Sequence, residues 1–168
     1  MQGGRLRGVI ERHLGSRDVA RVIYGAIIGL ALVLALQAHP PSAAVVGASL
    51  VGTAAAVGLA ELYSEVVGTE ARLRRSVRLR ELREMAGEAV AVFVGAGFPA
   101  IFFLLAAVGI LERHTAFTLA KWSGLGLICG YGFLAARLAG SGVLRALAHA
   151  AVMGVVGGAL IAVKALLH

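Results

Sequence analysis

The chain has 168 residues, 59% of them hydrophobic, and a mean hydropathy of +0.86. A soluble domain is usually about 45–50% apolar, so this composition excludes a single water-soluble core. The net charge of +7 would be compatible with nucleic-acid binding, but the arginines flank long apolar runs, which favours membrane topology and contact with anionic lipids. The sequence therefore predicts an integral membrane protein without a nucleic-acid partner.

The first predicted element is a basic cytoplasmic arm over 1–21. It should remain attached, because the apolar run after it is too long for a cleaved signal segment. Residues 22–60 contain no Asp, Glu, Lys or Arg, which leaves room for two spans of about 20 residues each. Pro40–Pro41 divides this run, because paired prolines cannot continue a helix interior. We expect spans over about 22–37 and 43–67.

The only sizeable polar segment, 68–87, is rich in helix formers. It predicts a basic cytoplasmic helix that lies near the headgroups or continues the second span outward. Three more apolar runs follow, and they predict spans over about 89–111, 115–136 and 143–166. Five spans result.

Lys and Arg are distributed unevenly between the two sides of these spans. If the N-terminus is inside, the inner side holds nearly all arginines, and the outer side holds only Arg113, Lys121 and Lys164. The sequence thus predicts an all-α polytopic protein of a prokaryotic inner (plasma) membrane, with five transmembrane helices, the N-terminus inside and the C-terminus outside. The expected organisation is an arm (1–21), spans one and two (22–67), a basic helix (68–87) and spans three to five (88–168).

Acidic residues cluster around the polar segment. Glu61 and Glu65 are four apart and share a helix face, and Glu88 belongs to a second stripe with Glu81 and Glu84. Carboxylate oxygens are hard ligands that suit Fe²⁺, Mn²⁺, Mg²⁺ or Ca²⁺. Two such stripes could converge on a cation. Alternatively, the glutamates pair with neighbouring arginines, which is the favoured interpretation for Glu81 and Glu84.

Two residues inside spans have polar or backbone consequences. Pro99 lacks a backbone N–H, so it predicts a kink that also frees a carbonyl for an ion or a neighbour. His149 is a possible proton relay, although an interfacial or hydrogen-bonded histidine fits the same position.

Other residues suggest packing and lipid contact. Gly25 and Gly29 form a small-xxx-small face that supports tight packing or a dimer. Four arginines of the polar segment are expected to contact lipid headgroups: Arg72, Arg74, Arg75 and Arg78. No nucleophile–base set, phosphate loop or cysteine–histidine motif is present, so the sequence predicts no enzyme.

Three short motifs resemble the vacuolar iron transporter family. Residues 22–25 with Gly29 are similar to the family's first helix, residues 60–64 to the end of its second, and residues 136–145 to its connection between helices 4 and 5. The sequence differs from the family at Ile27–Ile28, where the family has Asn-Asp, and at Val57, where it has Met.

The resemblance implies a homodimer that moves ferrous iron or manganese in exchange for protons. Glu61 would then line the path, and Glu65 and Glu88 would receive the cation. Two other functions remain open. One is a non-transporting accessory or scaffold subunit that binds other membrane subunits. The other is a membrane protein that binds anionic lipids through its arginines.

Overall fold

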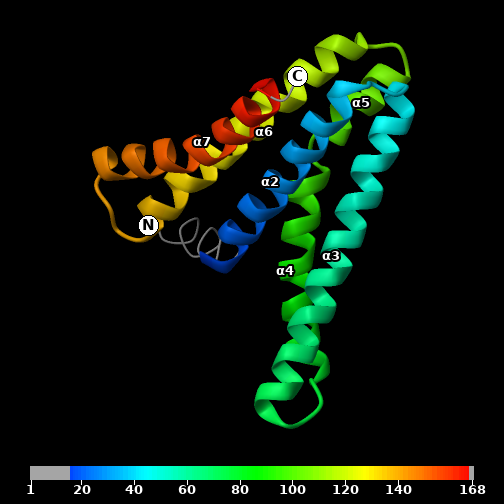
Figure 1. Ribbon diagram of the computed structural model, residues 1–168. Helices are drawn as coiled ribbons and strands as arrows, with labels where there is room; N and C mark the ends of the chain where they lie inside the picture. Colours follow the sequence, from blue (N-terminus) through cyan, green and yellow to red (C-terminus); the bar gives the residue numbers. More distant parts are fainter. Residues whose placement is uncertain (1–15, 167–168) are drawn as a thin grey trace, which may run out of the picture.

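The structure is a computed structural model that describes the backbone of residues 16–166, and this part is all-helical. Most of the expected arm therefore lies outside the described residues. The helices, labelled as in Figure 1, are α2 (Ser16–Ala38), α3 (Ala43–Leu73), α4 (Leu79–Gly97), α5 (Ala100–Ala107), α6 (Arg113–Leu138) and α7 (Val143–Leu166).

The composition of the helices identifies a membrane protein. Within the described residues, α2, α3, α6 and α7 are each long and apolar enough to cross a bilayer. The helices α4 and α5 add a fifth span if the bent pair counts as one, and they meet at an angle of 52°. The break falls at Phe98 and Pro99, where the proline lacks the N–H that would continue the helix ladder. The all-helical membrane fold is therefore confirmed, with four or five spans.

The polar segment forms the end of a helical hairpin. Ser42 caps the start of α3 by accepting a hydrogen bond from the Val45 backbone N–H, and the helix continues to Leu73. Arg74 then takes a left-handed conformation, with φ of 50°, and α4 begins at Leu79. Residues 68–87 thus form no separate helix: α3 continues the second span outward to Leu73, which is one of the two expected arrangements, and α4 begins at Leu79. A single helix glycine costs only about 1 kcal/mol, so Gly68 and Gly87 do not end these helices.

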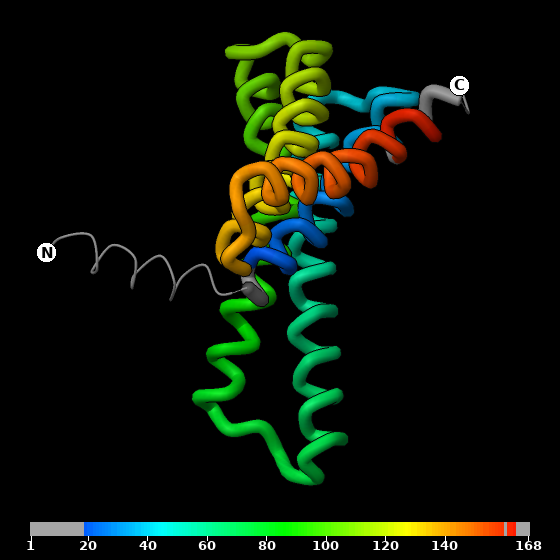
Figure 2. The backbone as a smooth tube through the Cα atoms, turned by 90° about the vertical axis from the view of Figure 1, so that its left-hand side faces the viewer, coloured from blue at the N-terminus to red at the C-terminus, as the bar shows by residue number. Residues whose placement is uncertain are grey.

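Helix α2 lies at the centre of the described helices. It packs against α4 and α6 and also contacts α3 and α7, so it lies between the long α3–α4 hairpin and the α6–α7 pair (Figure 1). Its buried side chains include Ala26, Leu30 and Val33. Seen from the side, the far end of the α3–α4 hairpin extends well beyond the other helices (Figure 2).

Glycines allow α2 and α4 to approach at backbone distance. A Cβ atom on Gly29 would lie 2.5 Å from the carbonyl oxygen of Ala96, and one on Gly25 would overlap the carbonyl oxygen of Val92. In the same way, a Cβ atom on Gly95 of α4 would overlap the carbonyl oxygen of Val22 in α2. The Gly25–Gly29 face is therefore used for packing within one chain.

Candidate functional site: an acidic cluster around Arg21

Three glutamates from two helices surround one arginine of a third helix. Arg21 of α2 forms ion pairs with Glu61 and Glu65 of α3 and with Glu88 of α4. Its Nη2 atom lies 2.7 Å from Oε2 of Glu88, to which it donates a hydrogen bond, and 3.5 Å from Oε2 of Glu65. Its Nη1 atom contacts Oε1 of Glu61. We call these four residues the Arg21 cluster.

Local helix geometry explains why these side chains meet. Glu61 and Glu65 are one turn apart on α3, so both point toward the same neighbour. Glu88 lies on α4, which runs antiparallel beside α3 and packs along α2. Arg21 lies little more than one turn into α2, where its long side chain can reach across both neighbours. The close α2–α4 approach at Gly25 fixes this arrangement from one turn away.

The cluster is largely shielded from solvent. The side chains of Arg21 and Glu88 are 19% and 15% exposed, and those of Glu61 and Glu65 are 25% and 30% exposed. All three carboxylates contact the guanidinium of Arg21. Arg72 lies beside the cluster: its Nη2 atom is 4.0 Å from Glu65 and donates a hydrogen bond to Thr69. The three carboxylates therefore lie close together in a partly buried site.

The guanidinium of Arg21 fills the space between the three carboxylates of the cluster. No group of three or more His, Cys, Asp or Glu side chains in the described part of the chain has a metal-holding geometry. The predicted site residues Glu61, Glu65 and Glu88 do come together, but Arg21 occupies the space between them. A metal ion would have to displace this guanidinium before the carboxylates could turn inward.

A second charged group lies at the end of the hairpin. Arg75 forms a bidentate pair with Glu81, with distances of 2.6 and 3.0 Å, and Glu81 also accepts from the Arg78 backbone N–H at 2.8 Å. Glu81 precedes the apolar part of α4, so it lies outside the span. The Arg75 hydrogen bonds and then the Arg78 N–H lower the pKa of Glu81 to about 2, and the same pair raises the pKa of Arg75.

This pair predicts a pH-dependent stability of the hairpin end. Because the pKa of Glu81 is depressed, its ionised carboxylate stabilises the folded hairpin end. This stabilisation is complete at pH values above about 4.5 and is lost as the pH falls through about 2. At neutral pH, Glu81→Gln should speed hydrogen exchange of the amides at 76–82, and this difference from wild type should vanish near pH 2. The control is Glu84→Gln, because Glu84 is 69% exposed and lies 3.5 Å from Arg80. Equal exchange in wild type and Glu81→Gln at neutral pH would exclude a structural role for the pair.

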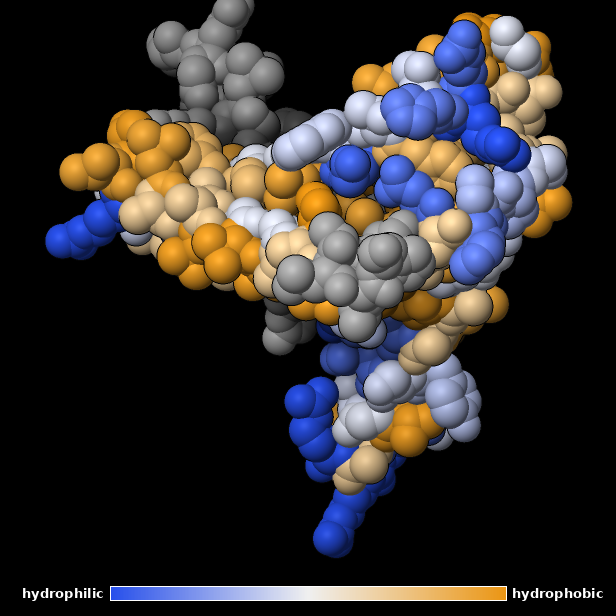
Figure 3. All heavy atoms as spheres, turned by 45° about the horizontal axis from the view of Figure 1, so that its top comes forward, coloured by the Kyte–Doolittle hydropathy of each residue, from blue (hydrophilic) through white to orange (hydrophobic). Residues whose placement is uncertain are grey.

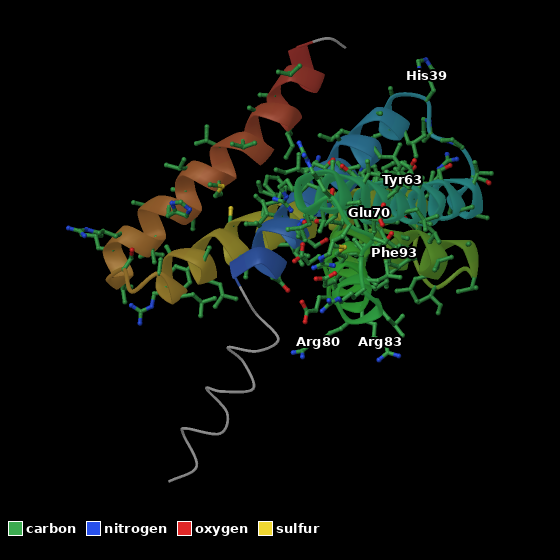
Figure 4. All side chains as sticks on the ribbon, turned by 90° about the horizontal axis from the view of Figure 1, so that it is seen from below. His39, Tyr63, Glu70, Arg80, Arg83 and Phe93 are labelled. Atoms are coloured by element: carbon green, nitrogen blue, oxygen red, sulfur yellow. The ribbon has the colours of Figure 1, made fainter. Side chains whose placement is uncertain are left out.

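The other predicted residues lie apart from the cluster. His149 is exposed on α7, which packs chiefly against α6, and Pro99 lies at the α4–α5 break. A pocket of about 440 Å³ lies near the opposite end of α2, lined by Gln37, Pro40, Glu112, Arg113, His114 and Phe117. His39 is on that side of the molecule, away from the hairpin end that carries Arg80 and Arg83 (Figure 4).

Comparison with known proteins adds no assignment: no family model, no curated protein and no solved structure matches the chain. The fold and composition therefore define the class, which is a helical membrane protein, and the Arg21 cluster is its most distinctive polar feature.

Proposed function

We propose that this protein is a transporter-like membrane protein that takes up a divalent cation, ferrous iron or manganese, at the Arg21 cluster. The observation that carries the proposal is the convergence of three carboxylates from two apolar helices on one partly buried point. Ionisable groups near a bilayer core are costly and are usually functional. Carboxylate oxygens suit both of these metal ions.

The proposed topology places the cluster at the cytoplasmic boundary. Five spans with the N-terminus inside give the inner side nearly all the arginines. Glu61 lies 18 residues after Ala43, which corresponds to about 27 Å along α3. Measured from the outer edge of a bilayer that is about 40–45 Å thick with its headgroups, that distance places Glu61 in the inner half of the membrane. A cytoplasmic cation would therefore meet Glu65 and Glu88 first, and Glu61 would be the ligand nearest the core.

In this proposal, Arg21 acts as a tethered cation that the transported ion displaces. Without an ion, its guanidinium balances part of the carboxylate charge and keeps the cluster closed. A divalent ion carries twice that charge, so it balances more of the carboxylate charge than the guanidinium it displaces. Protons are the proposed exchange ion, because carboxylates that lose their cation can accept them.

The proposed transporter is a homodimer. Light scattering of the purified protein measures its molar mass and so tests this oligomeric state.

Ion flux tests the proposal. We expect purified protein in liposomes to admit Mn²⁺ under an inward gradient, and Glu61→Gln to lower the rate by about tenfold or more, since it removes the ligand nearest the core. The matched control is Glu84→Gln, an exposed glutamate at the hairpin end, which should transport at the wild-type rate. A wild-type rate equal to that of empty liposomes, or an unchanged rate in Glu61→Gln, would contradict transport.

A second function is favoured by the same arginine. If Arg21 holds the cluster closed permanently, the four residues serve only to clamp α2, α3 and α4 together. The protein would then be a non-transporting accessory or scaffold subunit of a membrane complex. This alternative predicts no Mn²⁺ flux from folded protein and a defined partner subunit that co-purifies in mild detergent. A chain that elutes only as a homodimer and carries Mn²⁺ would exclude it.

A further inference from the structure

The end of the α3–α4 hairpin, residues 72–84, has more positive charge than its own acidic groups can neutralise. We call this segment the hairpin tip. Six arginines lie there with only two glutamates, and these pair with Arg75 and Arg80. Three further arginines are exposed and make no ion pair with a described side chain: Arg74, Arg78 and Arg83. The tip therefore presents guanidinium groups that are available to an external anion.

The tip also exposes large apolar side chains between these arginines. Leu73 is 50% exposed, Leu79 is 64% exposed and Leu82 is 38% exposed. Arg80 and Arg83 point away from the helix pair in the view from below (Figure 4), and hydrophilic side chains cover much of the lower projection of the molecule, with an apolar patch among them (Figure 3). Alternating arginines and leucines match a surface that is both anionic and partly apolar, which describes the interface of an acidic bilayer.

The length of α3 brings the tip to the right depth. Its 31 residues correspond to about 46 Å of helix. A bilayer with its headgroup layers is about 40–45 Å thick, and spans are tilted by about 20° on average. A helix that begins at the outer edge of the bilayer therefore ends close to the opposite phosphate layer. Arginine side chains extend several ångströms further and can reach phosphates from there.

We propose that the hairpin tip binds anionic headgroups of the bilayer that the protein spans. Arg74, Arg78 and Arg83 bind lipid phosphates, and Leu73 and Leu79 insert into the interface beside them. Guanidinium groups favour phosphate because the two can share paired, charge-assisted hydrogen bonds. This contact holds the lower ends of α3 and α4 against the membrane. It does not depend on transport.

A fluorophore at the tip tests this inference in nanodiscs, in which both leaflets have the same composition. The label is attached through Leu79→Cys in a Cys129→Ala background, which leaves one thiol in the chain. We expect blue-shifted emission in discs that contain phosphatidylglycerol and no shift in discs of phosphatidylcholine alone. Salt of roughly 1 M, where the Debye length is about 3 Å, should reverse the shift.

Variants decide whether the three arginines are responsible. The triple variant Arg74→Gln, Arg78→Gln and Arg83→Gln should lose most of the shift, and the corresponding triple lysine variant should keep it, because it keeps the charge. The matched control is Arg113→Gln, Arg137→Gln and Arg145→Gln, which removes equal charge elsewhere and should keep the full shift. Equal emission in both lipids would overturn the proposal, and so would an equal loss in the control. A shift produced by soluble acidic peptide but not by lipid would assign the tip to a protein partner instead.

Discussion

Replacing Arg21 with glutamine is expected to lower the free energy of unfolding by about 2 kcal/mol. Removing one partner of a buried ion pair costs about 3–5 kcal/mol, and the partial exposure of these four side chains reduces that value. The loss arises because Glu61, Glu65 and Glu88 would then repel one another at close range. Thermal unfolding in mild detergent measures the effect.

Manganese should reverse this loss. In Arg21→Gln the three carboxylates lack their cation, so a bound ion stabilises the folded state by mass action. We expect millimolar Mn²⁺ to raise the melting temperature of the variant more than that of wild type. The control is Arg113→Gln, because Arg113 donates only to the carbonyls of Pro40 and Pro41 among described residues. A variant as stable as wild type would show that the cluster contributes nothing to folding.

The second large effect is expected at the α2–α4 contact. Gly25→Ala and Gly95→Ala should each lower the free energy of unfolding by about 1–3 kcal/mol or more, the usual cost of overpacking. The new Cβ would overlap backbone atoms of Val92 or Val22, and backbone cannot rotate away as a side chain can. Because this contact lies beside Arg21, both variants should also weaken the Arg21 cluster.

The matched control for these glycines lies on α3. Gly52 is exposed, and a Cβ there would meet nothing within 4 Å. Gly52→Ala should leave stability unchanged or raise it by about 0.5–1 kcal/mol, because alanine loses less entropy than glycine in a helix. Urea or thermal unfolding compares the three variants. A loss at Gly52 equal to that at Gly25 would contradict close packing as the cause.

The membrane class and the helix positions could be predicted from local sequence. Apolar run length determines where spans occur, and Pro40–Pro41 ends a helix regardless of tertiary context. The shared face of Glu61 and Glu65 also follows from helix geometry alone. Whether 68–87 forms a separate helix or continues the second span could not be decided from sequence, because its two glycines resemble helix ends. Packing of α3 against α4 outweighs their small helix penalty.

The partner of the glutamates could not be predicted, because it depends on a long-range contact. The sequence alone places Arg21 at the end of the cytoplasmic arm, where an arginine next to a span is typically an interfacial anchor. In the structure, α2 begins at Ser16, so Arg21 is inside the helix and faces α3 and α4. The sequence does contain one indication of a helix packed beside Arg21. Gly25 lies one turn further along the same helix, and a helix that packs closely at Gly25 also lies next to Arg21. Only the fold identifies that neighbour as α4.

Calorimetric titration of purified protein with Mn²⁺ tests most directly whether the Arg21 cluster is a cation site. We expect Arg21→Gln to bind Mn²⁺ about tenfold or more tightly than wild type, a difference of about 1.4 kcal/mol, because the competing guanidinium is gone. We also expect that adding Glu61→Gln to Arg21→Gln removes most of this gain. Arg21→Gln protein that is folded and binds no Mn²⁺ would contradict a cation site at this cluster.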